Sequence, residues 1–344
     1  MLKENEKEVF LKVDNLSKHF PMKKGVLSKQ KSAVKAVDGV HFDIYKGETL
    51  GVVGESGCGK STMARLLIKL YEATEGSIEM EGKRIESLNK QELKKFRRDI
   101  QMVFQDPYAS LNPKWTIKRT LLEPLKVHGI GSRNERIRRV KEILNAVGLN
   151  ESYAERYPHE FSGGQRQRIG IARALILNPK LIIADEPVSA LDISVQAQVI
   201  NILRKLQQEY NLTYLFITHD LSVVEHIADR VIVMYLGRIV EVSTTEKLFE
   251  KPNHPYTEAL ISAVPEVNSE VKKERIILSG DVPDPANPPS GCAFHTRCPY
   301  SMEVCKTKRP ELQSINEQQQ VACHLYDNNT IIGAMEEKKK KVLT

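Results

Sequence analysis

The chain has 344 residues, 41% of them hydrophobic and 28% charged, with a net charge of +7. This composition suits a globular protein of one large domain with an appendage, or of two domains. The chain contains no run of 18 apolar residues, and its charged start, MLKENEKEVFLKV, is not typical of a signal peptide, so we expect a cytoplasmic protein. The positive charge is compatible with nucleic acid, an anionic membrane surface or nucleotide phosphates as partners.

Two kinds of strand are predicted along the chain. Runs of continuous apolar residues are typical of strands that are buried on both faces of a parallel sheet, and they occur at Thr49–Gly54, Leu181–Asp185 and Tyr214–Thr218. The runs HFDIY, SIEMEG and RIVEV alternate polar and apolar residues, which predicts an antiparallel, half-exposed sheet. The expected fold class is α/β, with a mainly parallel core sheet and an antiparallel β subdomain.

A glycine-rich loop, GESGCGKST, follows the first apolar strand and leads into the helical run MARLLIKL. It fits the phosphate-binding pattern G-x-x-x-x-G-K-[ST] in the context that this pattern requires, with backbone NH groups pointing at phosphate oxygens. We expect Lys60 to span the β- and γ-phosphates, Ser61 to bind Mg²⁺ and Thr62 to support the α-phosphate side. The residues assigned to the nucleotide are Gly54, Glu55, Ser56, Gly57, Cys58, Gly59, Lys60, Ser61 and Thr62.

A helical insertion is expected between about residues 107 and 165. Within it, Ser132 and Glu135 form a predicted capping box, and Gly148 is the expected stop of the helix. An apolar stripe runs along one face of this helix through Ile137, Val140, Leu144 and Val147.

The segment FSGGQ, at 161–165, places a second set of exposed NH groups at the start of a helix, RQRIGIARALI. That is an anion site by the same physics as the first loop. Because the chain's own phosphates are already enclosed by Lys60 and its loop, we expect this second site to serve the nucleotide of another subunit in a head-to-tail dimer. The residues assigned to it are Ser162, Gly163, Gly164 and Gln165.

Acidic residues and a histidine close the two later apolar strands. Asp185 ends LIIAD, where we expect it to hold Mg²⁺ through water, and Glu186 is expected to reach the attacking water. His219 follows the strand YLFIT at the same edge of the sheet, which favours a hydrogen bond to the γ-phosphate over a purely structural role.

A change of composition follows residue 260. The proline-rich run DVPDPANPPSG ends the main domain, and four cysteines, Cys292, Cys298, Cys305 and Cys323, fall in a short window beyond it. Such clustering in a cytosolic chain favours a metal site over disulfides. Four thiolates suit a [4Fe-4S] cluster; Zn²⁺ or four free thiols are the alternatives, and His295 and His324 are spare ligands. We expect this module to lie apart from the phosphate-binding loop.

With these motifs in this order, residues 9–260 resemble the ATP-binding subunits of ABC transporters, whose signature motif is LSGGQ; Phe161 replaces the leucine here. The resemblance implies that Gln105 links the Mg²⁺ site to the helical insertion and contributes to that site. It also implies that Asp192 faces the partner chain and that Phe20 stacks on adenine.

The motifs ESGCGKST, QDPYASLNP, YPHEFSGGQRQR, KPNHPYTEAL and PPSGCAFHTRCP together resemble the oligopeptide and dipeptide importer subfamily. The resemblance implies an ABC ATPase domain over residues 1–260 and a C-terminal extension over 261–330, which in close relatives carries a [4Fe-4S] cluster. We expect the charged tail over 331–344 to be flexible. The resemblance also implies a peripheral location on the cytoplasmic face of the membrane, under two permease subunits. An extracytoplasmic binding protein delivers the peptide, and the second ATPase chain is paralogous, giving a heterodimer, or identical.

Two other functions compete with peptide import. Nickel and some sugar importers share the subfamily motifs, so the same motor could serve another small solute. A soluble ABC ATPase that acts on nucleic acid or ribosomes is a further alternative, favoured by the positive charge. The single ATPase unit and the absence of a long heptad-bearing insertion between Gln105 and Ser162 argue against it, so no nucleic-acid partner is expected.

Overall fold

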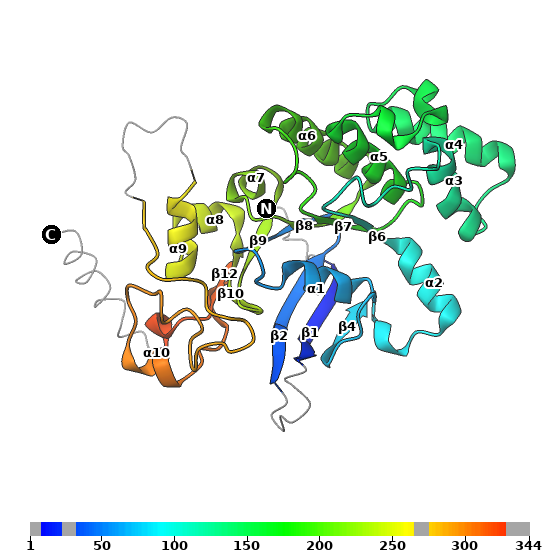
Figure 1. The fold of residues 1–344 in the computed structure, drawn as a ribbon. Helices are drawn as coiled ribbons and strands as arrows, with labels where there is room; N and C mark the ends of the chain where they lie inside the picture. The colour runs from blue at the N-terminus through cyan, green and yellow to red at the C-terminus, as the bar shows by residue number, and fades with distance from the viewer. Residues whose placement is uncertain (1–7, 23–31, 265–274, 328–344) are drawn as a thin grey trace, which may run out of the picture.

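The computed structural model describes residues 8–22, 32–264 and 275–327, and Figure 1 shows their arrangement. The strands form a smaller antiparallel sheet of order β2-β1-β4-β5 and a larger mixed sheet of order β11-β12-β10-β9-β3-β8-β7-β6. The strands are β1 Val9–Met22, β2 Ser32–Tyr45, β3 Thr49–Val53, β4 Glu75–Met80, β5 Lys83–Arg84, β6 Ile100–Val103, β7 Leu181–Asp185, β8 Thr213–Ile217, β9 Arg230–Tyr235, β10 Arg238–Thr244, β11 Gln313–Asn316 and β12 Gln319–Val321.

The strands β9, β3, β8, β7 and β6 form the parallel part of the larger sheet, in which β6 is the edge strand. Every residue of β3, β7 and β8 is buried, which confirms the prediction from their continuous apolar runs. Because these strands share a direction, the loops that follow them meet at one edge of the sheet. The short strands β6 and β9 were not predicted.

The smaller sheet packs against the larger one with helix α1 between them. Side chains of α1, such as Met63 and Leu67, share one core cluster with Leu16 of β1, Ile44 of β2 and Ile183 of β7. The alternating runs HFDIY and SIEMEG lie in β2 and β4 of this antiparallel sheet and are partly exposed, as predicted. The helix that follows the phosphate-binding loop is therefore held on both sides by sheets.

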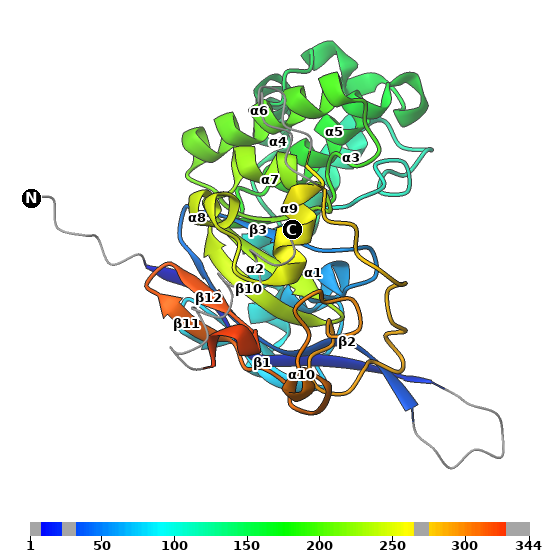
Figure 2. The same ribbon diagram turned by 90° about the vertical axis from the view of Figure 1, so that its left-hand side faces the viewer.

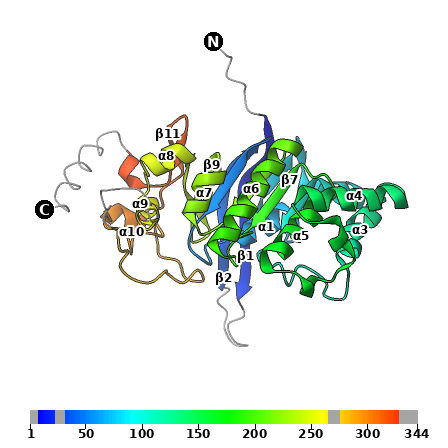
Figure 3. The ribbon, with the colours of Figure 1, turned by 90° about the horizontal axis from the view of Figure 1, so that it is seen from above.

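The helices α3, α4 and α5 gather at one end of the molecule in Figures 1 and 3, and the segment α8–α10 lies at the opposite end. The capping box of α4 is confirmed, since Ser132 N donates to Glu135 Oε2 at 2.6 Å and Glu135 N to Ser132 Oγ at 3.4 Å. The helices are α1 Lys60–Leu67, α2 Lys90–Asp99, α3 Ile117–Val127, α4 Arg133–Ala146, α5 Gly163–Leu175, α6 Ile193–Tyr210, α7 Leu221–Ile227, α8 Thr245–Glu250, α9 Pro255–Ser262 and α10 Glu303–Thr307, with 3₁₀ turns at Ile85–Ser87, Glu151–Glu155, Pro158–Glu160 and His324–Tyr326.

The end of the chain extends the larger sheet. In Figure 2, β12 and β11 lie beside β10, and Glu241 to Ser243 pair with β12. The run RIVEV was predicted to be half-exposed, and that prediction is wrong. Residues 239–243 of β10 are all buried because β9 and β12 flank the strand and later segments cover it. Burial even includes Glu241, whose carboxylate accepts hydrogen bonds from the backbone NH groups of Asn253 and His254.

Among the described residues, no helix is both long and apolar enough to cross a membrane. The charged tail that was predicted to be flexible, at 331–344, lies outside the described residues.

Candidate functional site

The glycine-rich loop connects the end of β3 to the start of α1. Gly54 and Gly59 have φ angles of 151° and 106°, and a Cβ on them would lie 2.2 Å from Met234 O and 2.0 Å from Ala36 O. Only glycine fits this path, because the backbone both turns left-handed and passes against two neighbouring strands. Lys60 is 4% exposed, and its Nζ donates to the carbonyls of Gly54 and Glu55 at 2.7 and 3.1 Å. The loop thus encloses its own lysine.

The rest of the loop divides into an exposed tip and a buried base. Ser56 and Gly57 are exposed, whereas Cys58 is buried and Thr62 is half-buried on α1. Burial raises the pKa of the Cys58 thiol, although nearby Lys60 opposes the shift. Cys58 is therefore a small packing residue at the base of the loop rather than an ionised nucleophile.

Ser61 and Asp185 meet across the loop, although they are 124 residues apart in sequence. Ser61 Oγ donates to Asp185 Oδ1 at 2.9 Å, and Asp185 is 2% exposed at the end of β7. Burial raises the pKa of the Asp185 carboxyl, and the hydrogen bond from Ser61 opposes that shift. A hydroxyl and a carboxylate that face each other are oxygen ligands of the kind that Mg²⁺ prefers.

Glu186 is the point where three segments of the chain converge. Gln105 Nε2 donates to Glu186 Oε2 at 2.9 Å, and His219 Nδ1 lies 3.4 Å from the same oxygen. The backbone of Glu186 has a φ of 47°, and its NH donates to Ile217 O at 2.8 Å. A left-handed glutamate directly after a buried strand is the kind of strained residue that concentrates at functional sites.

The segment predicted as a second anion site begins α5. Ser162 is the N-cap, with its NH donating to Gln165 Oε1 at 3.0 Å and its Oγ accepting from Gln165 N at 3.4 Å. Gly163 and Gly164 form the first turn, and Asp192 is the N-cap of the neighbouring helix α6 without a side-chain cap bond. The side chain of Ser162 is exposed at this helix N-terminus.

The two glycines of this turn offer a matched pair of substitutions. A Cβ on Gly164 would lie 2.3 Å from Val195 Cγ1 of α6, whereas one on Gly163 would lie 3.5 Å from Leu191 Cδ2, an ordinary contact. We expect Gly164→Ala to lower the free energy of unfolding by about 1–3 kcal/mol, because the stiff valine must shift. Gly163→Ala should change it by less than about 0.5 kcal/mol. Urea unfolding of both variants checks this, and equal stabilities would contradict the close approach of α5 and α6.

Phe20 lies on β1 in edge-to-face contact with Tyr71, at a centroid distance of 5.6 Å and an interplanar angle of 82°. Lys18 Nζ lies 5.3 Å from the Phe20 ring centroid. The Phe20 ring is half-buried.

The structure contradicts the prediction of a [4Fe-4S] cluster at the four cysteines. Among the residues that the structure describes, which include all four, no group of three or more His, Cys, Asp or Glu could hold a metal ion. The pKa of Cys298 is raised to about 12, chiefly by burial, and burial likewise raises the pKa of Cys292 and Cys323. In this buried environment the thiols pack as small, largely apolar groups. The zinc alternative fails with the cluster, because the described residues contain no group of ligands that could hold either one.

The expected spare ligands are also engaged elsewhere. His324 contacts Asp327 Oδ2 through Nδ1 and Lys308 O at 2.8 Å through Nε2. His295 Nδ1 lies 2.9 Å from Cys292 O. Both ring nitrogens of His324 and the Nδ1 atom of His295 therefore contact other groups of the chain, and only the Nε2 atom of His295 has no such contact among those found in the described residues.

The expectation that the C-terminal segment lies apart from the phosphate-binding loop is wrong. The guanidinium of Arg297, the residue before Cys298, forms an ion pair with the carboxylate of Glu55 in the loop at 2.8 Å. Tyr256 of α9 accepts a hydrogen bond from Glu55 N at 2.9 Å. Sequence reasoning missed both residues, because nothing in the local pattern around Arg297 or Tyr256 indicates a partner about 200 residues upstream.

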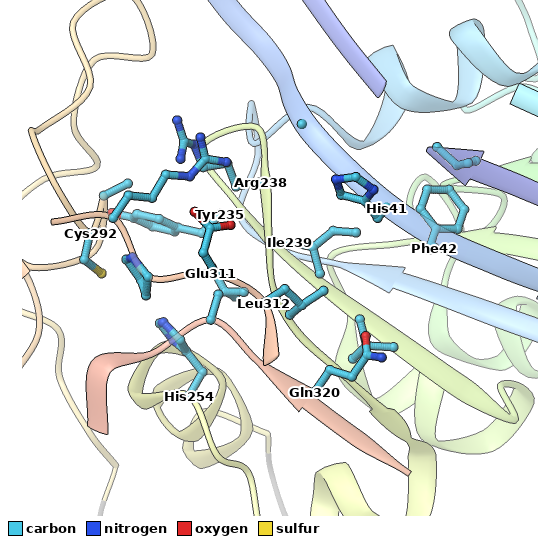
Figure 4. A pocket seen from close by; sticks show the side chains of 18 of the residues that line it. His41, Phe42, Tyr235, Arg238, Ile239, His254, Cys292, Glu311, Leu312 and Gln320 are labelled. Carbon is cyan, nitrogen blue, oxygen red and sulfur yellow. The ribbon is translucent and has the colours of Figure 1, made fainter. Parts of the chain in front are cut away.

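A cavity of about 490 Å³ lies between β2, β10 and the C-terminal segment (Figure 4). Tyr235, Arg238 and Cys292 line one side of it, and His41 and Phe42 of β2 line the other. His254 is fully buried at its edge, and burial lowers the pKa of its ring to about 3. None of the nucleotide-site residues predicted from the sequence lines this cavity.

Two family models match the chain. The model described as "ABC transporter" matches residues 37–189, which include the glycine-rich loop, the FSGGQ segment and Glu186. The model described as "Oligopeptide/dipeptide transporter, C-terminal region" matches residues 240–305, which include Tyr256 and Arg297.

Curated relatives match nearly the full length. The oligopeptide transport ATP-binding protein AppF of Bacillus subtilis is 56% identical over 322 residues, covering 93% of this chain and 98% of the relative. The di/tripeptide transport ATP-binding protein DppF of Pseudomonas aeruginosa is 50% identical over 317 residues, covering 92% of this chain and 98% of the relative.

Solved structures match the fold. The ATP-binding cassette MJ0796, in a dimeric post-hydrolysis state bound to ADP and Pi, has a TM-score of 0.61 at 34% identity, covering 68% of this chain and 98% of that chain. The protein cbiO1 from Clostridium perfringens, part of the ABC transporter complex cbiONQ, has a TM-score of 0.61 at 27% identity, covering 71% of this chain and 92% of that chain.

The prediction of a heterodimer is corrected by these comparisons. The matched titles that describe an ATPase pair speak only of a dimeric cassette, and none of the matched relatives named above is described as half of a heterodimer.

Proposed function

The chain belongs to the oligopeptide/dipeptide family of ABC transporter ATP-binding proteins, and from this premise we propose how its residues perform ATP hydrolysis and how the subunit works in its transporter. It is the ATPase subunit of an oligopeptide/dipeptide importer, with the P-loop ABC ATPase fold. The observation that carries the mechanism is the convergence of Gln105 and His219 on the Glu186 carboxylate, beside the Ser61–Asp185 pair.

We assign Mg²⁺ to the oxygen atoms of Ser61 and Asp185, which fit the ion in ligand type, with Gln105 contributing through its side-chain oxygen. When bound, the ion neutralises developing charge on the β- and γ-phosphates. Lys60, on the loop that would wrap the phosphates, supplies a further positive charge to them. The Nδ1 atom of His219 faces Glu186, so we assign its Nε2 atom to the γ-phosphate.

Glu186 is assigned as the general base, whose Oε atoms accept the proton of the attacking water. Gln105 orients the carboxylate through its hydrogen bond to Oε2, and the left-handed backbone of Glu186 fixes the direction of the side chain. The remaining loop residues, from Gly54 to Thr62, bind the phosphates chiefly through backbone NH groups.

The exposed N-terminus of α5 is assigned to the nucleotide of a second ATPase chain. Ser162, Gly163, Gly164 and Gln165 would contact the neighbour's phosphates in a head-to-tail dimer, with Asp192 at the same interface and Phe20 stacking on the adenine of its own nucleotide. The capping of α5 by Ser162 supports this assignment, since it aims the first NH groups of the helix at the surface.

At the level of the transporter, we propose that two permease subunits and an extracytoplasmic binding protein complete the complex, and that the ATPase lies on the cytoplasmic face of the membrane. Residues 1–260, with the helical part at 107–165, form the motor in this proposal, and residues 261–330 form the extension. Closure of the ATPase pair on ATP and reopening after hydrolysis would drive alternating access to the peptide.

Reconstitution tests this function. The chain is co-expressed with its permease subunits and a second ATPase chain, and the complex is placed in liposomes with the binding protein and a labelled tripeptide. We expect ATP-dependent peptide uptake, and hydrolysis that rises about tenfold when loaded binding protein is added, because substrate delivery commits the complex to the closed state.

The competing functions are outcomes of the same experiment. Stimulation and uptake with nickel in place of peptide would show that the cargo is a metal ion. Hydrolysis that DNA or RNA stimulates in the absence of any permease would overturn the importer function.

A further inference from the structure

The C-terminal segment contacts the phosphate-binding loop through two parallel hydrogen bonds. Arg297 Nη1 donates to Glu55 Oε2 at 2.8 Å, and Nη2 donates to Oε1 at 3.1 Å. This bidentate geometry is the strongest form of an arginine–carboxylate pair, because both ends are planar and fixed in orientation. The two residues are 242 positions apart in the chain, so the tertiary structure alone brings them together.

The contact belongs to a larger assembly of buried side chains. Arg297 Nη1 also reaches the Tyr235 hydroxyl at 3.5 Å, and the Tyr235 ring contacts those of Tyr256 and Phe294 at centroid distances of 4.8 and 5.3 Å. The Tyr256 hydroxyl accepts from Glu55 N at 2.9 Å. Glu55 is thus held through its backbone by α9 and through its carboxylate by Arg297.

Burial makes this pair costly to break. The Arg297 side chain is 8% exposed and that of Glu55 is 26% exposed. The pKa of the Arg297 guanidinium is raised above its usual value, chiefly by its hydrogen bonds to Glu55. If the guanidinium were removed, the Glu55 carboxylate would remain beside the loop with its charge uncompensated.

The position of that charge matters for the nucleotide. Glu55 follows Gly54 in the loop, and its carbonyl accepts from Lys60 Nζ at 3.1 Å. The Glu55 carboxylate also acts on the loop: after burial, its negative charge is among the causes that raise the pKa of the Cys58 thiol, whose Sγ lies 3.8 Å from Lys60 Nζ. A negative charge that acts within the loop opposes a triphosphate, since like charges in a partly buried site repel. Arg297 cancels this charge from outside the loop.

A second ion pair ties the segment to the strand behind the loop. Arg309 Nη1 lies 3.6 Å from Asp38 Oδ2, and Arg309 Nη2 donates to Asp38 O at 3.3 Å. Asp38 lies two residues beyond Ala36, whose carbonyl oxygen packs against Gly59 of the loop. The C-terminal segment therefore contacts the loop directly at Glu55 and its supporting strand at Asp38.

We propose that Arg297 is a positioning residue for ATP, which fixes the phosphate-binding loop and neutralises Glu55, so that the C-terminal segment forms part of the nucleotide site. This inference deepens the proposed ATPase function and rests on it. Arg297 acts through Glu55 and does not itself touch the nucleotide.

The test uses Arg297→Gln in the full-length chain, with MgATP binding measured by titration calorimetry and hydrolysis measured in the assembled complex. We expect Kd and KM for ATP to rise about tenfold, while kcat at saturating ATP stays within about twofold, because the charge acts on binding rather than on the water. Adding Glu55→Gln to Arg297→Gln removes the uncompensated charge and should bring Kd back to within about twofold of wild type.

The control is Lys306→Gln, which removes the same charge from an exposed side chain of the segment whose ion-pair partner among the described residues is Glu303. Its Kd should equal that of wild type. A Kd for Arg297→Gln within about twofold of wild type, or a double variant that stays as weak as the single one, would overturn the inference. If Arg297→Gln does not fold, Arg297→Lys decides, because it keeps the positive charge beside Glu55 while losing the two parallel hydrogen bonds. Its Kd for ATP should stay within about threefold of wild type, and a rise of about tenfold contradicts the charge argument.

These outcomes are separate from failure of the proposed function. A wild-type chain that binds no MgATP would refute the ATPase function itself. Normal binding by wild type and by Arg297→Gln alike would refute only the role of Arg297.

Discussion

Glu186→Gln is expected to lower ATP turnover of the assembled transporter by about 10²–10³-fold, because the amide cannot accept the proton of the attacking water. ATP binding should be retained. The glutamine oxygen can still accept the hydrogen bond that Gln105 Nε2 donates to Oε2 at 2.9 Å, so the geometry of the site is preserved. The variant should therefore accumulate an ATP-bound dimer, visible by size-exclusion chromatography with MgATP.

The matched control for this prediction is Glu209→Gln. Glu209 lies on the exposed side of α6, where its ion-pair partner among the residues that the structure describes is Lys205, at 3.6 Å, so the same chemical change there should leave turnover unaltered. Steady-state hydrolysis by Glu186→Gln within about threefold of wild type would refute the assignment of the general base.

Ser162→Arg is expected to abolish hydrolysis in the assembled complex while leaving ATP affinity of the isolated chain unchanged. Ser162 is exposed at the N-terminus of α5, so the long cationic side chain would fill the space in front of the helix NH groups without disturbing the core. If those NH groups complete the nucleotide site of a neighbouring chain, the loss appears only when two chains meet.

Two measurements on each protein make this prediction decisive: MgATP binding by the isolated chain, and hydrolysis by the complex. Ser152→Arg is the control, since Ser152 is also exposed near the start of a helical turn but lies outside the signature segment. A large loss of ATP binding by the isolated Ser162→Arg chain would show that the segment serves the chain's own nucleotide.

The cysteine window shows the limit of counting residue types. Four cysteines within a short stretch predicted a metal cluster, and the structure does place their thiols near enough to raise one another's pKa. It also buries them among apolar groups, where Cys292 and Cys298 pack with Phe294 and Cys323 packs with Leu325. Spacing in the chain cannot distinguish a metal site from such packing, because the distinction depends on burial and on where each sulfur points.

Local sequence alone determined the phosphate-binding loop, the three buried parallel strands and the capping of α4. Each of these depends on residues that are neighbours in the chain: glycines that permit a turn, apolar runs that fill both faces of a sheet, and a serine three positions before a glutamate. The family resemblance added the prediction that Gln105 belongs to the Mg²⁺ site, because several motifs in a fixed order identify a family more specifically than any one of them.

The tertiary structure alone decided the contacts between distant segments. The hydrogen bond from Gln105 to Glu186 spans 81 residues and the pair of Arg297 with Glu55 spans 242, and no periodicity in the chain encodes either. Likewise RIVEV alternates in sequence, yet both faces of β10 are buried, because Ile239 and Val242 pack in the core that contains α1 and Val240 packs in a cluster with side chains of later segments, such as Tyr256 and Phe294. The hydrophobic pattern of a segment indicates which of its side chains an isolated strand would expose. Burial in the folded chain depends also on which other segments pack over that strand.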